Sequence, residues 1–411
     1  MKVMDQHIGE AFVRLALAVE EHLPGYVDSY FGPNEWSEEA KQTGKLPLPE
    51  LTDRAVQLAE DLPRNHEMDG QRKDFLEKQI RAMQMSLRLL QGEAVPLAEE
   101  VEGLYDVRPE WKDEANFREA HKLFDQVLPG DGSLQERMEI WDKSLEIPVE
   151  KAKELLPLIT DRLRALTAEK FDLPQGESFT VEFVSDQPWG AYNWYLGGYR
   201  SRIDINTDLP IRAHGLPWLL AHEGYPGHHT ELSIKEAKLV RQSNYREHLL
   251  TLINAPSCVI AEAIATTALK IVLPDDELEQ WYRNEILPRA GLTHIDAARI
   301  MEMSRAGRKM SGLMGNAAFM LHDQHQSPEE ITAYIQHYGL RTEKEASQSL
   351  KFLSNPLYRS YIFTYHIGYD LLDELFTHVD RDTYFRRLLE EPVTPSQVRQ
   401  WMQDERGTAS L

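Results

Sequence analysis

Apolar side chains recur at three- and four-residue steps over most of the first 170 residues. The first stripe runs from Phe12 to Leu23 and ends at Pro24-Gly25. This spacing places apolar residues on one face of a helix. The same pattern returns in five later segments: Leu51 to Leu62, Phe75 to Leu90, Phe117 to Leu128, Met138 to Leu145 and Val149 to Phe171. We therefore expect residues 1–175 to form an N-terminal helical region.

The pattern changes near Gly176. Residues 178–184 alternate polar and apolar side chains, and residues 200–206 do so over their second half, with an aromatic stretch between them. Alternation with a period of two is typical of half-buried strands. We expect a mainly α fold with a small antiparallel β-sheet at this point. Such a sheet could pair with a peptide backbone by strand addition, or it could serve only for packing.

Length and composition set the domain organisation. The 411 residues can bury a large core, and 42% hydrophobic and 27% charged residues describe an ordinary globular protein. We find neither an internal repeat nor a low-complexity linker. Residues 1–175 and 176–411, the second being the region of the candidate site, are therefore expected to form one continuous domain with a cleft.

Charge and cysteine content limit the partners. The formal net charge of −22 argues against nucleic acid, because phosphate binding depends on basic patches. The first twenty residues carry several charges, so we expect neither a signal peptide nor a membrane span there. The single cysteine, Cys258, excludes an internal disulfide and fits a reducing compartment. The expected location is the cytoplasm, and the oligomeric state is not indicated.

Three histidines lie within eight residues: His222, His228 and His229, with Glu223 directly after the first. A histidine pair can bind a metal ion, and a neighbouring carboxylate that is not a ligand can accept a proton from water. The familiar form of this device is His-Glu-x-x-His on a helix, with the two rings on one face. Here the spacing is longer. Six residues of ideal helix rotate by about 240°, which would point His222 and His228 apart.

Pro226 and Gly227 can resolve this difficulty. Proline removes a backbone donor, and glycine accepts unusual dihedral angles, so the pair can bulge or break the helix. We expect His228, the first histidine after the break, to be the second ligand. His229 is the alternative, although about 10 Å of helical rise would separate it from His222. The other interpretation of the motif is a polar helix end terminated by Pro-Gly.

Glu262 is the candidate third ligand. It is the only charged residue from Cys258 to Leu269, in a segment that is otherwise apolar apart from two threonines. Burying a carboxylate on such a helix is costly unless it is paired, hydrogen-bonded or bound to metal. The alternative is that Glu262 faces solvent or pairs with an arginine. Two histidines and a glutamate leave an open position for water, as in catalytic zinc sites, so the expected cofactor is Zn²⁺.

Other histidines are weaker candidates. His214 precedes the predicted helix that opens at Pro217, so we treat it as structural. His322 and His325 are spaced three apart near a predicted helix end, with Asp323 between them. Because nothing marks Asp323 as buried, this pair is the less favoured metal site.

A tyrosine stripe follows Pro356. Tyr358, Tyr361, Tyr365 and Tyr369 are separated by three or four residues, so they can share one face of a helix. A phenol aimed at a cleft can stabilise a developing oxyanion. An aromatic stripe can equally be plain core.

The chain resembles a family of uncharacterised bacterial proteins with a His-Glu-x-x-Pro-Gly-His-His signature. The residues that carry this resemblance are His222-Glu223, Pro226-Gly227-His228-His229, Glu262 and Tyr365-x-Ile367-Gly368. That family is similar to the gluzincin clan of zinc metallopeptidases, whose helical members include carboxypeptidases and oligopeptidases. The resemblance covers roughly Gly176 to Tyr369 and is specific at the histidine motif.

This resemblance implies a large helical metallopeptidase-like fold and a set of roles. His222, His228 and Glu262 would be the zinc ligands, Glu223 the general base, and Tyr365 the oxyanion or substrate contact. The family often has Glu-Gly-Trp around the third ligand and a glutamine two places after the histidine pair. This chain has Glu262-Ala263-Ile264 and Glu231 instead, and it is shorter. These departures concern the substrate pocket and leave the metal ligands in place.

The expected function is that of a zinc-dependent metallopeptidase, carboxypeptidase-like or oligopeptidase-like, acting on a peptide or small amide. Metal-activated water would attack the amide, with His229 and Glu231 able to orient the ligands. One alternative is a zinc hydrolase of a non-peptide amide or ester. The other is a non-catalytic helical binding or scaffold protein with a vestigial metal site.

Overall fold

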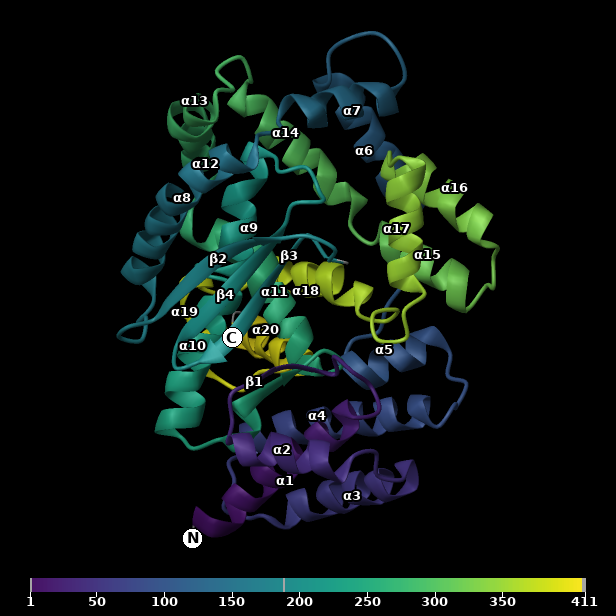
Figure 1. Cartoon of the computed structure of the whole chain (residues 1–411), viewed down its shortest axis with the longest axis vertical. Helices are drawn as coiled ribbons and strands as arrows, with labels where there is room; N and C mark the ends of the chain where they lie inside the picture. The colour runs from purple at the N-terminus through teal and green to yellow at the C-terminus, as the bar shows by residue number, and fades with distance from the viewer. Residues whose placement is uncertain (1, 188, 409–411) are drawn as a thin grey trace.

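The computed structural model describes residues 2–187 and 189–408, and helices dominate this part of the chain (Figure 1). Helices hold 66% of the residues and strands 8%, so the mainly α fold class is confirmed. The helices of the first 175 residues are α1 (Lys2–Glu20), α2 (Asn34–Thr43), α3 (Leu48–Asp61), α4 (Gly70–Leu90), α5 (Leu97–Tyr105), α6 (Glu114–Val127), α7 (Leu134–Ser144) and α8 (Val149–Lys170).

The later helices lie at the centre of the molecule and around it. They are α9 (Leu216–Glu223), α10 (His228–Lys235), α11 (Pro256–Val272), α12 (Asp275–Trp281), α13 (Leu287–Ala290), α14 (Ala297–Gly307), α15 (Leu313–His322), α16 (Pro328–Gly339), α17 (Glu343–Leu353), α18 (Ile362–Leu375), α19 (Arg381–Glu390) and α20 (Pro395–Thr408). In Figure 1, α1 to α4 lie at one end of the molecule, α7, α13 and α14 at the other, and α9, α11 and α18 between them.

Each predicted apolar stripe of the N-terminal region coincides with a helix. The stripes 51–62 and 75–90, for example, fall on α3 and α4. The helices α2 and α5 were not predicted. In α2 the buried residue is Trp36 alone, so it has no apolar stripe, and α5 is a short segment rich in glutamate. α2 depends on packing and on the proline before it more than on a periodic pattern, whereas the buried positions of α5 follow helical spacing over only nine residues.

The sheet near the predicted site is mixed. Its strands are β2 (Ser178–Val184), β3 (Ala191–Gly197) and β4 (Arg200–Asn206), in the order β2-β4-β3. β3 and β4 form an antiparallel hairpin, and β2 runs parallel to β4. A small sheet is therefore present where it was expected, and its antiparallel pairing holds for β3 and β4 but not for β2 and β4. The aromatic stretch between them is itself a strand, so the chain reverses twice and β4 returns to the direction of β2.

A second, two-stranded sheet joins distant parts of the chain. β1 (Val27–Tyr30) pairs antiparallel with β5 (Leu250–Leu252), and β1 also packs beside β3. The apolar cores likewise extend across residue 175. Phe12 shares a core cluster with Leu252, and Leu163 shares another with Ile264. The N-terminal helices are thus packed into the same structure as the later ones.

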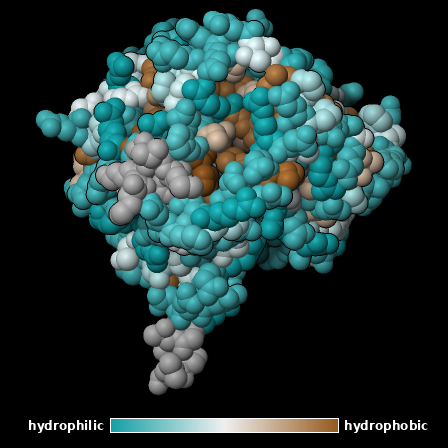
Figure 2. Space-filling model, turned by 90° about the horizontal axis from the view of Figure 1, so that it is seen from below, coloured by the Kyte–Doolittle hydropathy of each residue, from teal (hydrophilic) through white to brown (hydrophobic). Residues whose placement is uncertain are grey.

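One face of the molecule is mostly hydrophilic, and on it hydrophobic side chains gather inside a hollow (Figure 2). Within the described residues, no single helix is long and apolar enough to cross a membrane, although the bent pair of helices at Pro256–Val272 and Asp275–Ala290 meets that test by length and composition.

A buried ion pair fixes α4 to the segment that precedes β5. Arg72 Nε lies 2.6 Å from Glu247 Oε1 and Arg72 Nη2 lies 2.9 Å from Oε2, with side chains only 3% and 0% exposed. The guanidinium also stacks over the ring of Tyr245. Removing one partner of such a pair leaves a buried charge without compensation.

We expect Glu247→Gln to lower the free energy of unfolding by about 3 kcal/mol, because the buried Arg72 guanidinium would lose its contact with the charged carboxylate of Glu247. The measurement is urea unfolding followed by circular dichroism. The matched control is Glu50→Gln, which removes the exposed pair between Glu50 and Arg54 and should change stability by less than about 0.5 kcal/mol. Equal effects of the two variants would contradict the structural role of the buried pair.

Candidate metal centre

The histidine motif spans the end of one helix and the start of the next. α9 has Pro217 in its first turn, as predicted, and its last two residues are His222 and Glu223. The chain then leaves the helical path and re-enters it at His228, the first residue of α10. The predicted break at Pro226-Gly227 is confirmed. Its result is that the His222 and His228 rings lie 4.8 Å apart, centre to centre, at 89° to each other.

Gly227 makes this return possible. A Cβ atom at this position would lie 1.9 Å from the carbonyl oxygen of His222 and 2.4 Å from that of Ala221. The Gly227 N–H donates to the Ala221 carbonyl at 2.9 Å. The backbone therefore folds directly onto the end of α9, which a side chain would prevent.

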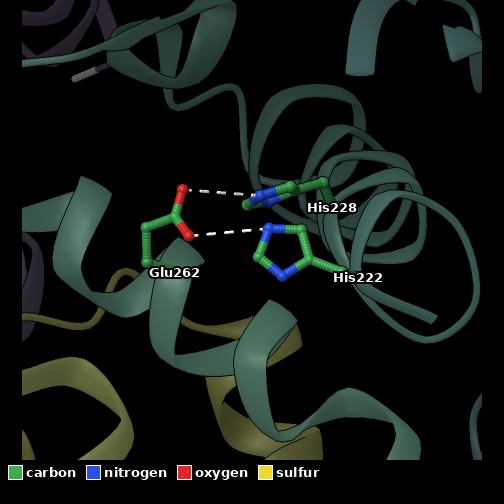
Figure 3. Close-up of side chains that lie close together, drawn as sticks. All are labelled: His222, His228 and Glu262. Carbon is green, nitrogen blue, oxygen red and sulfur yellow. Dashed lines mark ion pairs between the residues drawn. The ribbon is translucent and has the colours of Figure 1, made fainter. Parts of the chain in front are cut away.

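Glu262 completes the group from a different helix. It lies on α11, is 4% exposed, and its helix packs against α9. Glu262 Oε2 is 3.6 Å from His222 Nε2, and Oε1 is 3.6 Å from His228 Nε2. Figure 3 shows the carboxylate facing both rings. The three residues offer ligand atoms that all lie within 4.8 Å of one another, so the structure brings the predicted triad together.

The donor set fits a zinc ion. Two imidazole nitrogens and one carboxylate, with room for a fourth ligand, match the composition of catalytic zinc sites. Glu262 Oε1 accepts a hydrogen bond from the Tyr361 hydroxyl at 2.6 Å, whereas the buried Oε2 has no hydrogen-bond partner among the described residues. A buried carboxylate oxygen without a partner is costly, and a cation between Glu262 and the two rings would remove that cost.

The pKa values of the three residues bear on whether they can bind a cation. Burial lowers the pKa of His222 to about 4, which keeps its ring neutral. Burial raises the pKa of Glu262, but the neighbouring His228, together with His222 and the Tyr361 hydroxyl, outweighs this and holds it below its usual value. Burial lowers the pKa of His228, yet the nearby carboxylates of Glu231 and Glu262 raise it overall. A cation at this position would therefore replace a proton on His228.

Glu231 lies near the Nδ1 atom of the His228 ring. Its Oε2 lies 4.0 Å from His228 Nδ1, and its Oε1 accepts a hydrogen bond from Lys235 Nζ at 2.5 Å. Carboxylates in this position commonly orient a metal-binding imidazole. The expected orienting role of Glu231 is therefore compatible with its contacts.

His229 has a different environment. Its ring is fully buried, with Nδ1 2.9 Å from Ser201 Oγ on β4 and Nε2 3.0 Å from Glu177 Oε2. These contacts tie α10 to the mixed sheet. His228 is therefore the histidine that the helix break brings to His222, and His229 does not contact the triad.

A cavity of about 180 Å³ lies beside the triad, and His222, His228 and Glu262 form part of its wall. Glu223 lines the same cavity and is 8% exposed. Burial, with a contribution from the charge of Glu262, raises the pKa of Glu223 to about 7. The Asn193 side chain donates to the Glu223 carbonyl at 2.6 Å, which fixes the end of α9 to β3.

Three of the four tyrosines in the stripe line the cavity beside the triad, and the fourth does not. α18 begins at Ile362, later than predicted, so Tyr358 and Tyr361 lie in the turns before it. Both line the cavity together with Tyr365, which is 36% exposed. Tyr369 does not share this surface, and instead its hydroxyl bonds to Lys270. Sequence reasoning missed the contact of Tyr361 with Glu262, although its position one turn before Tyr365 was the available signal.

The remaining histidines do not join the site. His322 Nε2 lies 2.8 Å from the Leu353 carbonyl oxygen, His325 is exposed, and His214 lines a separate cavity. Across residues 2–187 and 189–408, the triad is the one group of histidine, cysteine and carboxylate side chains that could hold a metal ion.

Comparisons with known proteins find solved structures of similar fold but do not assign the chain to a family. No family model matches the chain, and no curated protein does. A candidate lipoprotein from Colwellia psychrerythraea is 14% identical with a TM-score of 0.51, covering 86% of this chain. The chain spans 66% of that protein's length. The architecture is therefore shared with a solved structure, and at this identity nothing beyond the architecture follows.

Two further structures are less similar. A candidate lipoprotein of unknown function from Shewanella oneidensis is 12% identical, with a TM-score of 0.49, and the alignment covers 90% of this chain and 76% of that one. A structure described as BsuCP is 10% identical, with a TM-score of 0.40, and the alignment covers 98% and 94%. Both likenesses are too weak to support a conclusion.

We expect Gly227→Ala to lower the free energy of unfolding by about 1–3 kcal/mol, because the added methyl group would clash with the carbonyl groups of α9. The measurement is again urea unfolding. The control is Gly70→Ala, at an exposed position where an added Cβ meets no atom within 4 Å. This second change should be neutral or stabilising by up to about 1 kcal/mol. A stable Gly227→Ala protein would refute the close approach.

Proposed function

We propose that this protein is a zinc-dependent hydrolase, specifically a metallopeptidase that cleaves amide bonds in peptides. The observation that carries the proposal is the buried Glu262 carboxylate, which faces two histidine rings at a cavity wall and whose Oε2 has no hydrogen-bond partner among the described residues. Glu223 lies in the same wall, directly after the first histidine. A purely structural metal site would have no need of a cavity or of a further carboxylate.

The proposed ligands are His222, His228 and Glu262. A zinc ion held by them would polarise a substrate carbonyl and lower the pKa of a water molecule. Glu223 accepts the proton of the attacking water and passes it to the leaving amine. Its carboxylate suits this role because it borders the cavity and has no lysine or arginine partner among the ion pairs of the described residues.

Two tyrosines take different roles in this proposal. The Tyr361 hydroxyl donates its hydrogen bond to Glu262, so Tyr361 positions this proposed metal ligand. Tyr365 is more exposed, and its ring packs 5.3 Å from that of Tyr361. Its hydroxyl is the one proposed to donate a hydrogen bond to the oxyanion that develops during amide cleavage.

The proposal includes the cytoplasm as compartment, because the single Cys258 suits a reducing environment.

A non-peptide amide or ester could be cleaved by the same groups, and a panel of peptide, amide and ester substrates separates these possibilities. A non-catalytic scaffold would be unaffected by loss of Glu223.

We expect about one zinc per chain in protein purified without chelator or affinity metal, measured by elemental analysis. His228→Ala and Glu262→Ala should lose most of it, because each removes a ligand. His229→Gln should lower stability but retain zinc, since His229 contacts Glu177 and Ser201. The control is His214→Ala, which changes a histidine outside the triad.

Two results would contradict the ligand assignment. One is the absence of bound metal from the wild-type protein even after zinc is added back and excess is removed. The other is loss of zinc from folded His229→Gln with full retention in His228→Ala, which would exchange the roles of the two histidines.

We expect Glu223→Gln to reduce kcat for peptide hydrolysis by at least about 100-fold, because a neutral amide cannot accept the proton. Zinc content should remain that of the wild type. The measurement combines steady-state kinetics with elemental analysis of the same preparation. Unchanged hydrolysis in a zinc-loaded variant would exclude Glu223 as the base and would favour a different mechanism.

A further inference from the structure

The cavity beside the triad is strongly acidic. Its described lining residues include six carboxylates but only one lysine, Lys235, and no arginine. The carboxylates are Asp28, Glu223, Glu231, Glu236, Glu247 and Glu262. Three of them have a cationic partner: Glu231 pairs with Lys235, Glu236 with Arg241 and Glu247 with Arg72. Glu223 and Glu262 already have roles in the proposed reaction, which leaves Asp28 unexplained.

Asp28 is held firmly at the cavity wall by three strands. It lies on β1, Tyr192 on β3 donates a hydrogen bond to its Oδ1, and Thr251 on β5 donates to its Oδ2 at 3.2 Å. No lysine or arginine forms an ion pair with it in the described part of the chain. Asp28 lines the same cavity as the triad, and burial raises the pKa of its carboxyl to about 6. Such a carboxylate is best stabilised by a cation that the ligand brings.

We propose that Asp28 binds the protonated amine at the N-terminus of a peptide, so that the enzyme removes residues from that end. This inference rests on the proposed function. A C-terminal carboxylate would instead need an arginine or a free lysine in the cavity. Lys235 is engaged by Glu231 at 2.5 Å, and the surrounding carboxylates would repel a second negative charge.

The dimensions of the cavity favour the end of a chain over its middle. About 180 Å³ is smaller than the several hundred Å³ that typical drug-sized ligands occupy. Its walls include the apolar side chains of Phe12, Phe31, Phe75 and Leu252. The cavity therefore suits one terminal residue with an apolar side chain.

A second cavity offers a place for the rest of the peptide. Tyr365 lines both the acidic cavity and a more open one of about 630 Å³. The second cavity contains Arg212 and Arg341. A peptide with its first residue beside Asp28 and its scissile carbonyl at the triad would extend past Tyr365 into this second cavity.

The first test compares three peptides with zinc-loaded protein: Leu-Gly-Gly, N-acetyl-Leu-Gly-Gly and Leu-Gly-Gly-amide. We expect kcat/KM for the acetylated peptide to be at least about tenfold lower than for Leu-Gly-Gly, because acetylation removes a charge-assisted hydrogen bond. The C-terminal amide should differ from Leu-Gly-Gly by less than about threefold, since on this proposal the C-terminal carboxylate is not bound in the acidic cavity.

The second test uses Asp28→Asn, which keeps the shape of the side chain and removes its charge. We expect kcat/KM for Leu-Gly-Gly to fall at least about tenfold, with little change for the acetylated peptide. Binding of leucinamide, measured by calorimetry with and without zinc, should weaken by a similar factor. The matched control is Glu35→Gln, an exposed change on α2 outside the cavity that should leave both quantities unchanged.

The outcomes separate the two proposals. Hydrolysis of none of the three peptides by zinc-loaded protein would overturn the metallopeptidase proposal, and leucinamide binding would still test Asp28. Equal cleavage of free and acetylated peptides, or a loss in Asp28→Asn that is the same for both, would overturn the role of Asp28 alone. Preference for a free C-terminal carboxylate would show that the enzyme acts from the opposite end.

Discussion

The candidate site depends on a close contact between backbones at Gly227. The chain leaves α9 after Glu223 and folds back so tightly that the Gly227 backbone rests against the carbonyl groups of Ala221 and His222. This contact places the first residue of α10 beside the last turn of α9. Two histidines that a continuous helix would point apart thereby face one carboxylate on α11. The backbone path, more than the histidine spacing, creates the triad.

The surroundings of the triad hold this arrangement from two sides. Behind α10, the fully buried His229 bridges Glu177 and Ser201, which ties the helix to the mixed sheet. On the other side, Tyr361 fixes one oxygen of Glu262. Buried polar groups that satisfy one another in this way keep the geometry rigid. A ligand set supported by such contacts loses little further conformational freedom when it binds a cation.

Much of this arrangement could be predicted from the sequence because it depends on local rules. The apolar stripes follow helical periodicity, Pro217 marks a helix start, and Pro226-Gly227 breaks the path. Glu262 was recognisable because it was the lone charge in its apolar segment. The sheet itself was predicted, but its parallel pair of β2 and β4 was not, since alternation gave no sign that residues 191–197 in the aromatic stretch form a strand. Asp28 carried no signal, because its neighbours Tyr192 and Thr251 are distant in the sequence.

The pairing of β1 with β5 has a consequence for how the cavity forms during folding. Ser29 and Thr251, which bond across these strands, are 222 residues apart, so the wall that carries Asp28 closes a long loop of the chain. The entropy of closing a loop must be overcome before the contacts it allows can stabilise the structure. The helices around the triad can pack earlier, because α9, α10 and α11 follow one another closely. The metal ligands therefore depend on contacts of shorter range along the chain than the wall of the cavity does.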